Sequence, residues 1–223
     1  MVVQKASLDD VAIVDDPIIH NRKALRFRIS RDEDFSSVAN GYPRAEVSFS
    51  SPLRFETASR YVVKWQSFIP VSFTPDSRQS VVIMQIHQGG CCSGPPPIML
   101  TIRGERYEFA ERSSRISVRE RQISPTTDDI EKWVSWTLEY TPDPGGTFAR
   151  TVLLKDGVEV YSSFGLANAY DDSQSSYLKI GLYKAGWKTE SSGPDRIEIL
   201  LGDMSICQET MPAKEVRSAT SRR

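Results

Sequence analysis

Cysteine and histidine are both scarce in this sequence, which contains three cysteines and two histidines. Cys91 and Cys92 are adjacent and Cys207 stands alone, so a disulfide framework is excluded, while one bridge to Cys207 and three free thiols both stay open. Adjacent cysteines lack the C-x₂-C spacing with which two thiolates hold one zinc ion. We therefore expect no metal site, although Asp and Glu are scattered too evenly for a structural calcium loop to be recognised.

An excess of charge of either sign is also absent, because 28 basic and 29 acidic residues give a net charge of -1. This net charge does not attract the chain to nucleic acid or to an anionic membrane, and we expect neither as a partner. Any anionic ligand must be held by a local basic cleft.

No hydrophobic run approaches the length that spans a membrane. Residues 1–17, MVVQKASLDDVAIVDDP, place acidic residues where a signal peptide needs an uninterrupted apolar core. We expect a monomer that is secreted or acts outside the cell. Removal of a signal peptide and export by another route are both compatible with this sequence.

Helical periodicity is rare, whereas short alternating runs broken by Gly, Pro, Asp and Ser are frequent, which is typical of a β-sandwich. Strands are expected at residues 24–30, 44–49, 61–69, 81–88, 98–102, 133–140, 148–154, 177–183 and 196–206. Asp156-Gly157 predicts a tight hairpin, and residues 126–133 predict one helical turn capped by Thr127 or Asp128. We therefore expect an all-β chain with one domain over residues 1–211 and a disordered basic tail over 212–223.

Three of these strands carry polar side chains along one face, because residues two apart in a strand point the same way. The polar rows are Arg44 with Glu46, Gln85 with His87, and Tyr177 with Lys179, Gly181 and Tyr183. Each row alone has an ordinary explanation, as a surface ion pair, an exposed histidine or a solvated face with aromatic cross-strand pairs.

Two further residues suggest a ligand beside the last of these strands. Gly181 is unfavourable in a strand interior, which indicates that something approaches the backbone closely there, and a sugar ring would fit. Trp187 follows the strand in a turn, where its ring could stack on a sugar, whereas the other three tryptophans are core candidates.

The three polar rows, taken together and in this order, resemble the alginate lyases of polysaccharide lyase family 7 and the related heparin-lyase-I-like and glucuronan lyases. Those families share an Arg-x-Glu strand, a Gln-x-His strand and a Tyr-x-Lys-x-Gly-x-Tyr strand, present here at 44–46, 85–87 and 177–183. The resemblance spans residues 40–205. It implies a β-jelly roll of two antiparallel sheets whose concave face is an open cleft for a polymer.

The resemblance also implies roles for the matching residues. Arg44 and Gln85 would hold and neutralise the C5 carboxylate of a uronate, His87 would assist or act as the base, and Tyr183 would be the acid or both acid and base. The residues expected to bind substrate are Glu46, Tyr177, Lys179 and Trp187. The expected partner is an anionic polysaccharide, cut internally by β-elimination, and no cofactor is required.

Two departures from family 7 leave the polymer open. Alginate lyases continue the first motif as Glu-Leu-Arg where this chain has Glu46-Val47-Ser48, and they place a Gln where this chain has Ala185. The glucuronan and heparin-like branches therefore stay open beside alginate.

The residue types suit elimination, in which the C5 proton leaves and charge accumulates on the carboxyl group. A guanidinium and an amide aimed at that charge stabilise it, and Tyr183 could serve as a base if Lys179 and Arg44 lower its pKa. One alternative is a non-catalytic carbohydrate-binding sandwich, because one fold serves many functions. A glycosidase needs two flanking carboxylates, and only Glu46 lies on these faces.

Overall fold

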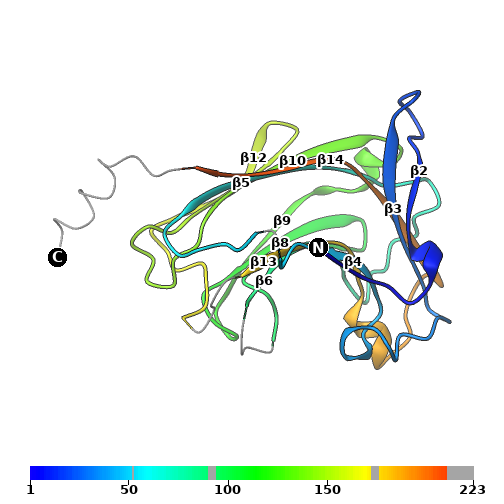
Figure 1. Cartoon of the computed structure of the whole chain (residues 1–223), viewed down its shortest axis with the longest axis horizontal. Coiled ribbons are helices and arrows are strands. Elements are labelled where there is room, and N and C mark those ends of the chain that lie inside the picture. Colours follow the sequence, from blue (N-terminus) through cyan, green and yellow to red (C-terminus); the bar gives the residue numbers. More distant parts are fainter. Residues whose placement is uncertain (52, 90–93, 172–175, 210–223) are drawn as a thin grey trace.

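The computed structural model describes residues 1–51, 53–89, 94–171 and 176–209. Two seven-stranded antiparallel sheets form a sandwich, and Figure 1 shows them as stacked layers. The sheet that carries the polar rows, named the cleft sheet, consists in order of β1 (Val2–Gln4), β4 (Arg44–Ser48), β13 (Tyr177–Tyr183), β6 (Val81–His87), β7 (Ile98–Arg103), β8 (Arg106–Arg112) and β9 (Val118–Pro125).

The second sheet, named the outer sheet, covers the other side of the core. It consists in order of β12 (Val158–Phe164), β11 (Arg150–Lys155), β10 (Trp133–Thr141), β5 (Arg60–Phe68), β14 (Arg196–Glu209), β3 (Lys23–Ser30) and β2 (Val11–Asp15). Four short 3₁₀ turns are the helical elements of the described residues: η1 (Leu8–Asp10), η2 (Ala39–Gly41), η3 (Thr127–Asp129) and η4 (Ala185–Lys188). The expected all-β jelly roll of two antiparallel sheets is confirmed.

Apolar side chains that alternate with polar ones fill the space between the sheets. On β13, Leu178, Ile180 and Leu182 are buried in the core, and the intervening side chains point to the opposite face. Large aromatic residues on facing strands, including Trp136 and Phe109, supply much of the buried apolar area that stabilises such a sandwich. This alternation fixes which side chains of β13 can face a ligand.

Both predicted turns are present, but the N-cap of the helical turn is one residue earlier than predicted. β11 and β12 pair antiparallel across Asp156 and Gly157, whose positive φ angles of 49° and 81° are those of a tight hairpin. The helical turn is also present, but its N-cap is Thr126 and not Thr127 or Asp128. No side-chain hydrogen bond marks that cap, so the cap residue could not be read from side-chain chemistry.

Several predictions fall outside the described residues: Cys91 and Cys92, the domain boundary at 211 and the tail over 212–223. The third cysteine, Cys207, is exposed on β14. No helix in the described part of the chain has the length and apolar content needed to cross a membrane.

Candidate active site

The three polar rows lie on three adjacent strands of the cleft sheet, since β13 pairs with β4 on one side and with β6 on the other. Across β4 and β13, Arg44 is opposite Tyr183 and Glu46 is opposite Gly181. Across β13 and β6, Lys179 is opposite Gln85 and Tyr177 is opposite His87. Paired residues share a face, so residues distant in sequence form one polar surface.

Glu46 is the centre of this surface. Its carboxylate accepts hydrogen bonds from Gln85 Nε2 at 2.5 Å and Arg44 Nη1 at 3.3 Å, and Lys179 Nζ lies 3.5 Å away. Glu46 is only 1% exposed, and breaking such a buried charge network is strongly destabilising. The predicted direct contact of Glu46 with substrate is therefore wrong, because its carboxylate is occupied in orienting Arg44, Gln85 and Lys179.

Gly181 has a different reason to be glycine from the one the sequence suggested. Its φ of 133° is in a region that other residues rarely adopt, and a Cβ at this position would collide with the carbonyl oxygen of Ala45 and, at 2.8 Å, with the Phe27 ring. The close approach is therefore by β4 and the core, and not by a sugar.

A cleft of about 1130 Å³ opens over the polar surface. Its described lining contains no Asp or Glu but five cationic residues: Arg44, Arg78, Arg103, Lys179 and Lys188. Gln85, His87, Tyr177 and Tyr183 also line it. The cleft is thus a local cationic site in a chain whose net charge is only -1.

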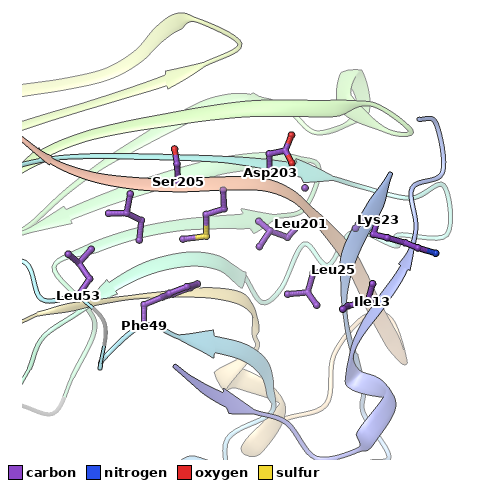
Figure 2. A pocket seen from close by; sticks show the side chains of 12 residues that line it. Ile13, Lys23, Leu25, Phe49, Leu53, Leu201, Asp203 and Ser205 are labelled. Carbon is purple, nitrogen blue, oxygen red and sulfur yellow. The ribbon is translucent and has the colours of Figure 1, made fainter. Parts of the chain in front are cut away.

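A second pocket, shown in Figure 2, is apolar and lies between the sheets. Leu25 and Leu201 of the outer sheet contribute to it together with Phe49 and Leu53, which follow β4. None of the predicted site residues lines this pocket of about 690 Å³. Its chemistry does not suit an anionic sugar, whose charge would lose its hydration there.

Tyr183 packs against the side chains of Arg44 and Tyr42. The guanidinium carbon of Arg44 is 4.3 Å from the ring centroid, and the Tyr42 ring packs edge-on with centroids 6.1 Å apart. Burial raises the pKa of the Tyr183 phenol above its ordinary value, although Arg44 opposes the shift. Arg44 thus acts on this pKa in the direction that the sequence suggested, but burial outweighs it, so the phenol is protonated at neutral pH and the condition for Tyr183 to act as a base is not met.

His87 is set up to accept a proton. Its Nδ1 lies 2.8 Å from the Gln88 carbonyl oxygen, which can only accept, so in the neutral ring Nδ1 carries the proton and Nε2 carries the lone pair that can accept one. The Tyr177 ring stacks on the imidazole at a centroid distance of 5.4 Å. Burial lowers the pKa of His87, aided by the charge of Lys179, so the imidazole is neutral at neutral pH.

Arg44 and Glu46 influence the pKa of both His87 and Tyr183. The Arg44–Glu46 pair therefore lies within electrostatic reach of the two groups that could move protons.

Trp187 does not belong to this site. Its side chain is only 8% exposed, packs in the core between the sheets and donates a hydrogen bond to the Ser192 carbonyl at 3.3 Å. The predicted stacking of Trp187 on a sugar is wrong for this reason. The neighbouring Lys188 lines the cleft instead.

Sequence patterns did not reveal five other residues that contribute to the cleft. Gln4 is on a three-residue edge strand, whereas Tyr42, Arg78 and Lys188 are in loops or a 3₁₀ turn and Arg103 ends β7. A periodicity of two identifies a face only within a strand, so loop residues carry no such signal.

The sequence profile of the polysaccharide lyase family matches residues 3–198, a span that includes all three polar rows. The chain belongs to the polysaccharide lyase family. It is thus an enzyme that acts on a polysaccharide, as the three motifs predicted. No curated protein shows significant sequence similarity to this lyase.

Solved structures of other lyases share the fold at low sequence identity. An endo-β-1,4-glucuronan lyase from the fungus Trichoderma reesei matches with a TM-score of 0.72 and 16% identity, covering 93% of this chain and 90% of that chain. Alginate lyase A1-II', of polysaccharide lyase family 7, matches with a TM-score of 0.67 and 14% identity over 94% of both chains. The alginate lyase AlyA1 from Zobellia galactanivorans matches with a TM-score of 0.60 and 13% identity, covering 91% of this lyase and 82% of that chain.

Proposed function

We propose that this lyase cleaves a uronic-acid-containing polysaccharide internally by β-elimination and leaves an unsaturated uronate at the new end. The cationic cleft carries the proposal, because its lining combines five cations with no carboxylate among the described residues. A polymer with a carboxylate on each uronate complements that charge. The alginate and glucuronan lyases that share the fold act on polymers of this kind.

Arg44 and Gln85 are proposed to bind the carboxylate of the uronate whose C5 proton is removed. Glu46 holds each of them through one hydrogen bond, so their remaining N–H groups are oriented without reorganisation during the reaction. Donors fixed in this way stabilise the negative charge that develops on the carboxyl group, and one such donor typically contributes ~100- to 1000-fold in rate.

His87 and Tyr183 are proposed to divide the two proton transfers. Nε2 of His87 takes the proton from C5, the electrons form the C4–C5 double bond, and the C4–O4 bond breaks. The Tyr183 phenol, which its raised pKa keeps protonated before the reaction, gives its proton to the departing O4. The elimination changes no overall oxidation state, so no redox cofactor takes part.

The first experiment follows the ultraviolet absorbance of the unsaturated uronate during separate incubations with alginate, glucuronan and heparin. We expect a rise with one of them. Tyr183→Phe should reduce that rate ~100- to 10,000-fold because it removes only the acid, whereas Tyr177→Phe on the same strand face keeps the ring that stacks on His87 and should lose less than about tenfold. Binding without any rise in absorbance would overturn the proposal in favour of a carbohydrate-binding module.

A further inference from the structure

Gln4 is the one side chain of the short edge strand β1 that reaches the cleft. Among the described strands β1 pairs with β4 alone, and the register puts Gln4 directly opposite Glu46, so both side chains are on the cleft face. Gln4 also lines the cleft, whereas Val2 and Val3 are exposed at the sheet edge. The backbone of β1 therefore presents this amide beside the buried carboxylate.

The Gln4 amide oxygen and the Glu46 carboxylate bind the same two cationic groups. Arg44 Nη1 donates to Gln4 Oε1 and to Glu46 Oε2, each at 3.3 Å. Lys179 Nζ donates to Gln4 Oε1 at 2.9 Å and lies 3.5 Å from Glu46 Oε2. Two donors and two acceptors thus form a closed square, in which a neutral oxygen and a charged one hold both cations.

The charges explain why a second acceptor is needed. Arg44 and Lys179 are 6% and 3% exposed, and the single carboxylate of Glu46 cannot neutralise both of them. Burial lowers the pKa of Lys179, which shows how costly its charge is at this position. A neutral amide oxygen stabilises both cations through hydrogen bonds and leaves their net positive charge available to a substrate carboxylate.

We propose that Gln4 is a positioning residue of the active site, which holds Lys179 and Arg44 in the geometry that binds a uronate carboxylate, an inference that rests on the proposed function. Gln4 acts through these cations and not on the reacting atoms. Its neutrality matters as much as its oxygen, because a carboxylate at this place would compete with the substrate for both cations.

Two nearly isosteric variants test the proposal, Gln4→Met and Gln4→Glu, with Gln208→Met and Gln208→Glu on exposed Gln208 of β14 as matched controls. Methionine removes the acceptor and keeps the shape, whereas glutamate keeps an acceptor and adds a charge. We expect KM for the polymer to rise about fivefold or more in both Gln4 variants, with a smaller change in kcat, and the Gln208 controls to behave as the unsubstituted chain.

A second measurement is independent of catalysis: the rate at which acetic anhydride acetylates Lys179, read by peptide mass spectrometry. Gln4→Met should raise this rate, because the amine is released, and Gln4→Glu should lower it, because a carboxylate retains the ammonium. Changes in opposite directions would not follow from a loosened β1. Unchanged labelling and unchanged KM in both variants would overturn the proposal. Acetylation rates of Lys179 that change in the same direction in both variants would also overturn it. If the unsubstituted chain forms no unsaturated product, the proposed function fails, while the labelling still decides the Gln4 contact.

Discussion

The guanidinium of Arg44 lies over the face of the Tyr183 ring, with 4.3 Å between its central carbon and the ring centroid. The same guanidinium donates to Glu46 and to Gln4. Arg44, itself proposed to bind the uronate carboxylate, therefore connects the group proposed as the acid with the two acceptors that orient the cleft cations. A planar guanidinium can stack and donate along several directions at once, which a lysine ammonium cannot do.

Replacement of Arg44 by Lys should therefore damage the lyase although the charge is kept. We expect kcat/KM to fall ~100-fold or more, because the fixed donors to the carboxyl group are lost together with the cover over Tyr183. Steady-state kinetics on the polymer that gives the fastest reaction measures this loss. Arg196→Lys on β14, where the arginine is exposed, should leave the kinetics unchanged. An Arg44→Lys variant with full activity would contradict the assigned role.

The pH dependence of the lyase should report His87. Burial lowers its pKa below the ordinary value of 6.5, so the imidazole becomes protonated, and loses its capacity as a base, only at pH values below that value. We expect kcat/KM to decline on the acidic side through this pKa. His87→Asn should remove the decline and reduce kcat/KM ~100- to 10,000-fold. Full activity in that variant would assign both proton transfers to Tyr183 and would contradict the proposed division.

Strand pattern was sufficient to predict which side chains of three strands share the face of the candidate site. The alternation in 177–183 assigned Lys179 and Tyr183 to one face, and that assignment holds because the opposite side chains fill the core. It could not show that Glu46 is buried and absent from the lining of the cleft, since burial depends on neighbouring strands brought together from distant parts of the chain. For the same reason, the sequence could not show that β4 and the Phe27 ring, and not a sugar, approach Gly181 closely.

Residues outside regular strands were harder to predict. Trp187 was expected in the cleft because it follows Tyr183, but η4 turns its ring into the core and leaves Lys188 at the surface of the cleft. Gln4 carried no signal, because a three-residue strand is too short to show a period of two. The direction of a side chain in a turn is set by tertiary packing, which local sequence does not encode.

The carboxyl group of Glu33, whose pKa is influenced by Asp10, should make stability depend on pH. Asp10 is buried and accepts hydrogen bonds from the backbone N–H groups of Ala6 and Ser7, which tie down the segment after β1. Burial, together with Asp10, raises the pKa of Glu33 from 4.5 to about 7. The native state thus keeps a proton that the unfolded chain releases between these two values, so stability should fall as the pH rises from 4.5 through about 7.

Glu33→Gln tests this relationship, because the amide donates to Asp10 without needing to be protonated. We expect the melting temperature of the unsubstituted chain to fall relative to that of the variant between pH 5 and pH 8. Glu105→Gln, at an exposed position between β7 and β8, serves as the control and should not change the pH profile. If the melting temperatures of Glu33→Gln and of the unsubstituted chain depend on pH in the same way, Glu33 does not hold a proton in the native state.

Lys184, the residue after Tyr183, forms a buried ion pair with Asp76; Lys184 has no exposed surface and Asp76 is only 7% exposed. Lys184 Nζ donates to Asp76 Oδ2 at 2.7 Å and to the Gln79 carbonyl at 3.1 Å, which joins the residue after Tyr183 to the loop that carries Arg78. Removal of one partner leaves the other buried and unpaired, so Lys184→Met should lower the free energy of unfolding by about 3–5 kcal/mol. Urea denaturation measures this change.

An exposed ion pair of similar geometry provides the matched control. Lys23 Nζ lies 2.5 Å from Asp15 Oδ1, but both side chains are largely accessible to solvent, and Lys23→Met should change stability by less than about 1 kcal/mol. The double variant Asp76→Leu with Lys184→Met should recover part of the stability lost by either single variant, because no unpaired charge is left. If the effects of the two single variants simply add, the buried pair is not coupled, and the connection between Tyr183 and the loop that carries Arg78 must depend on packing alone.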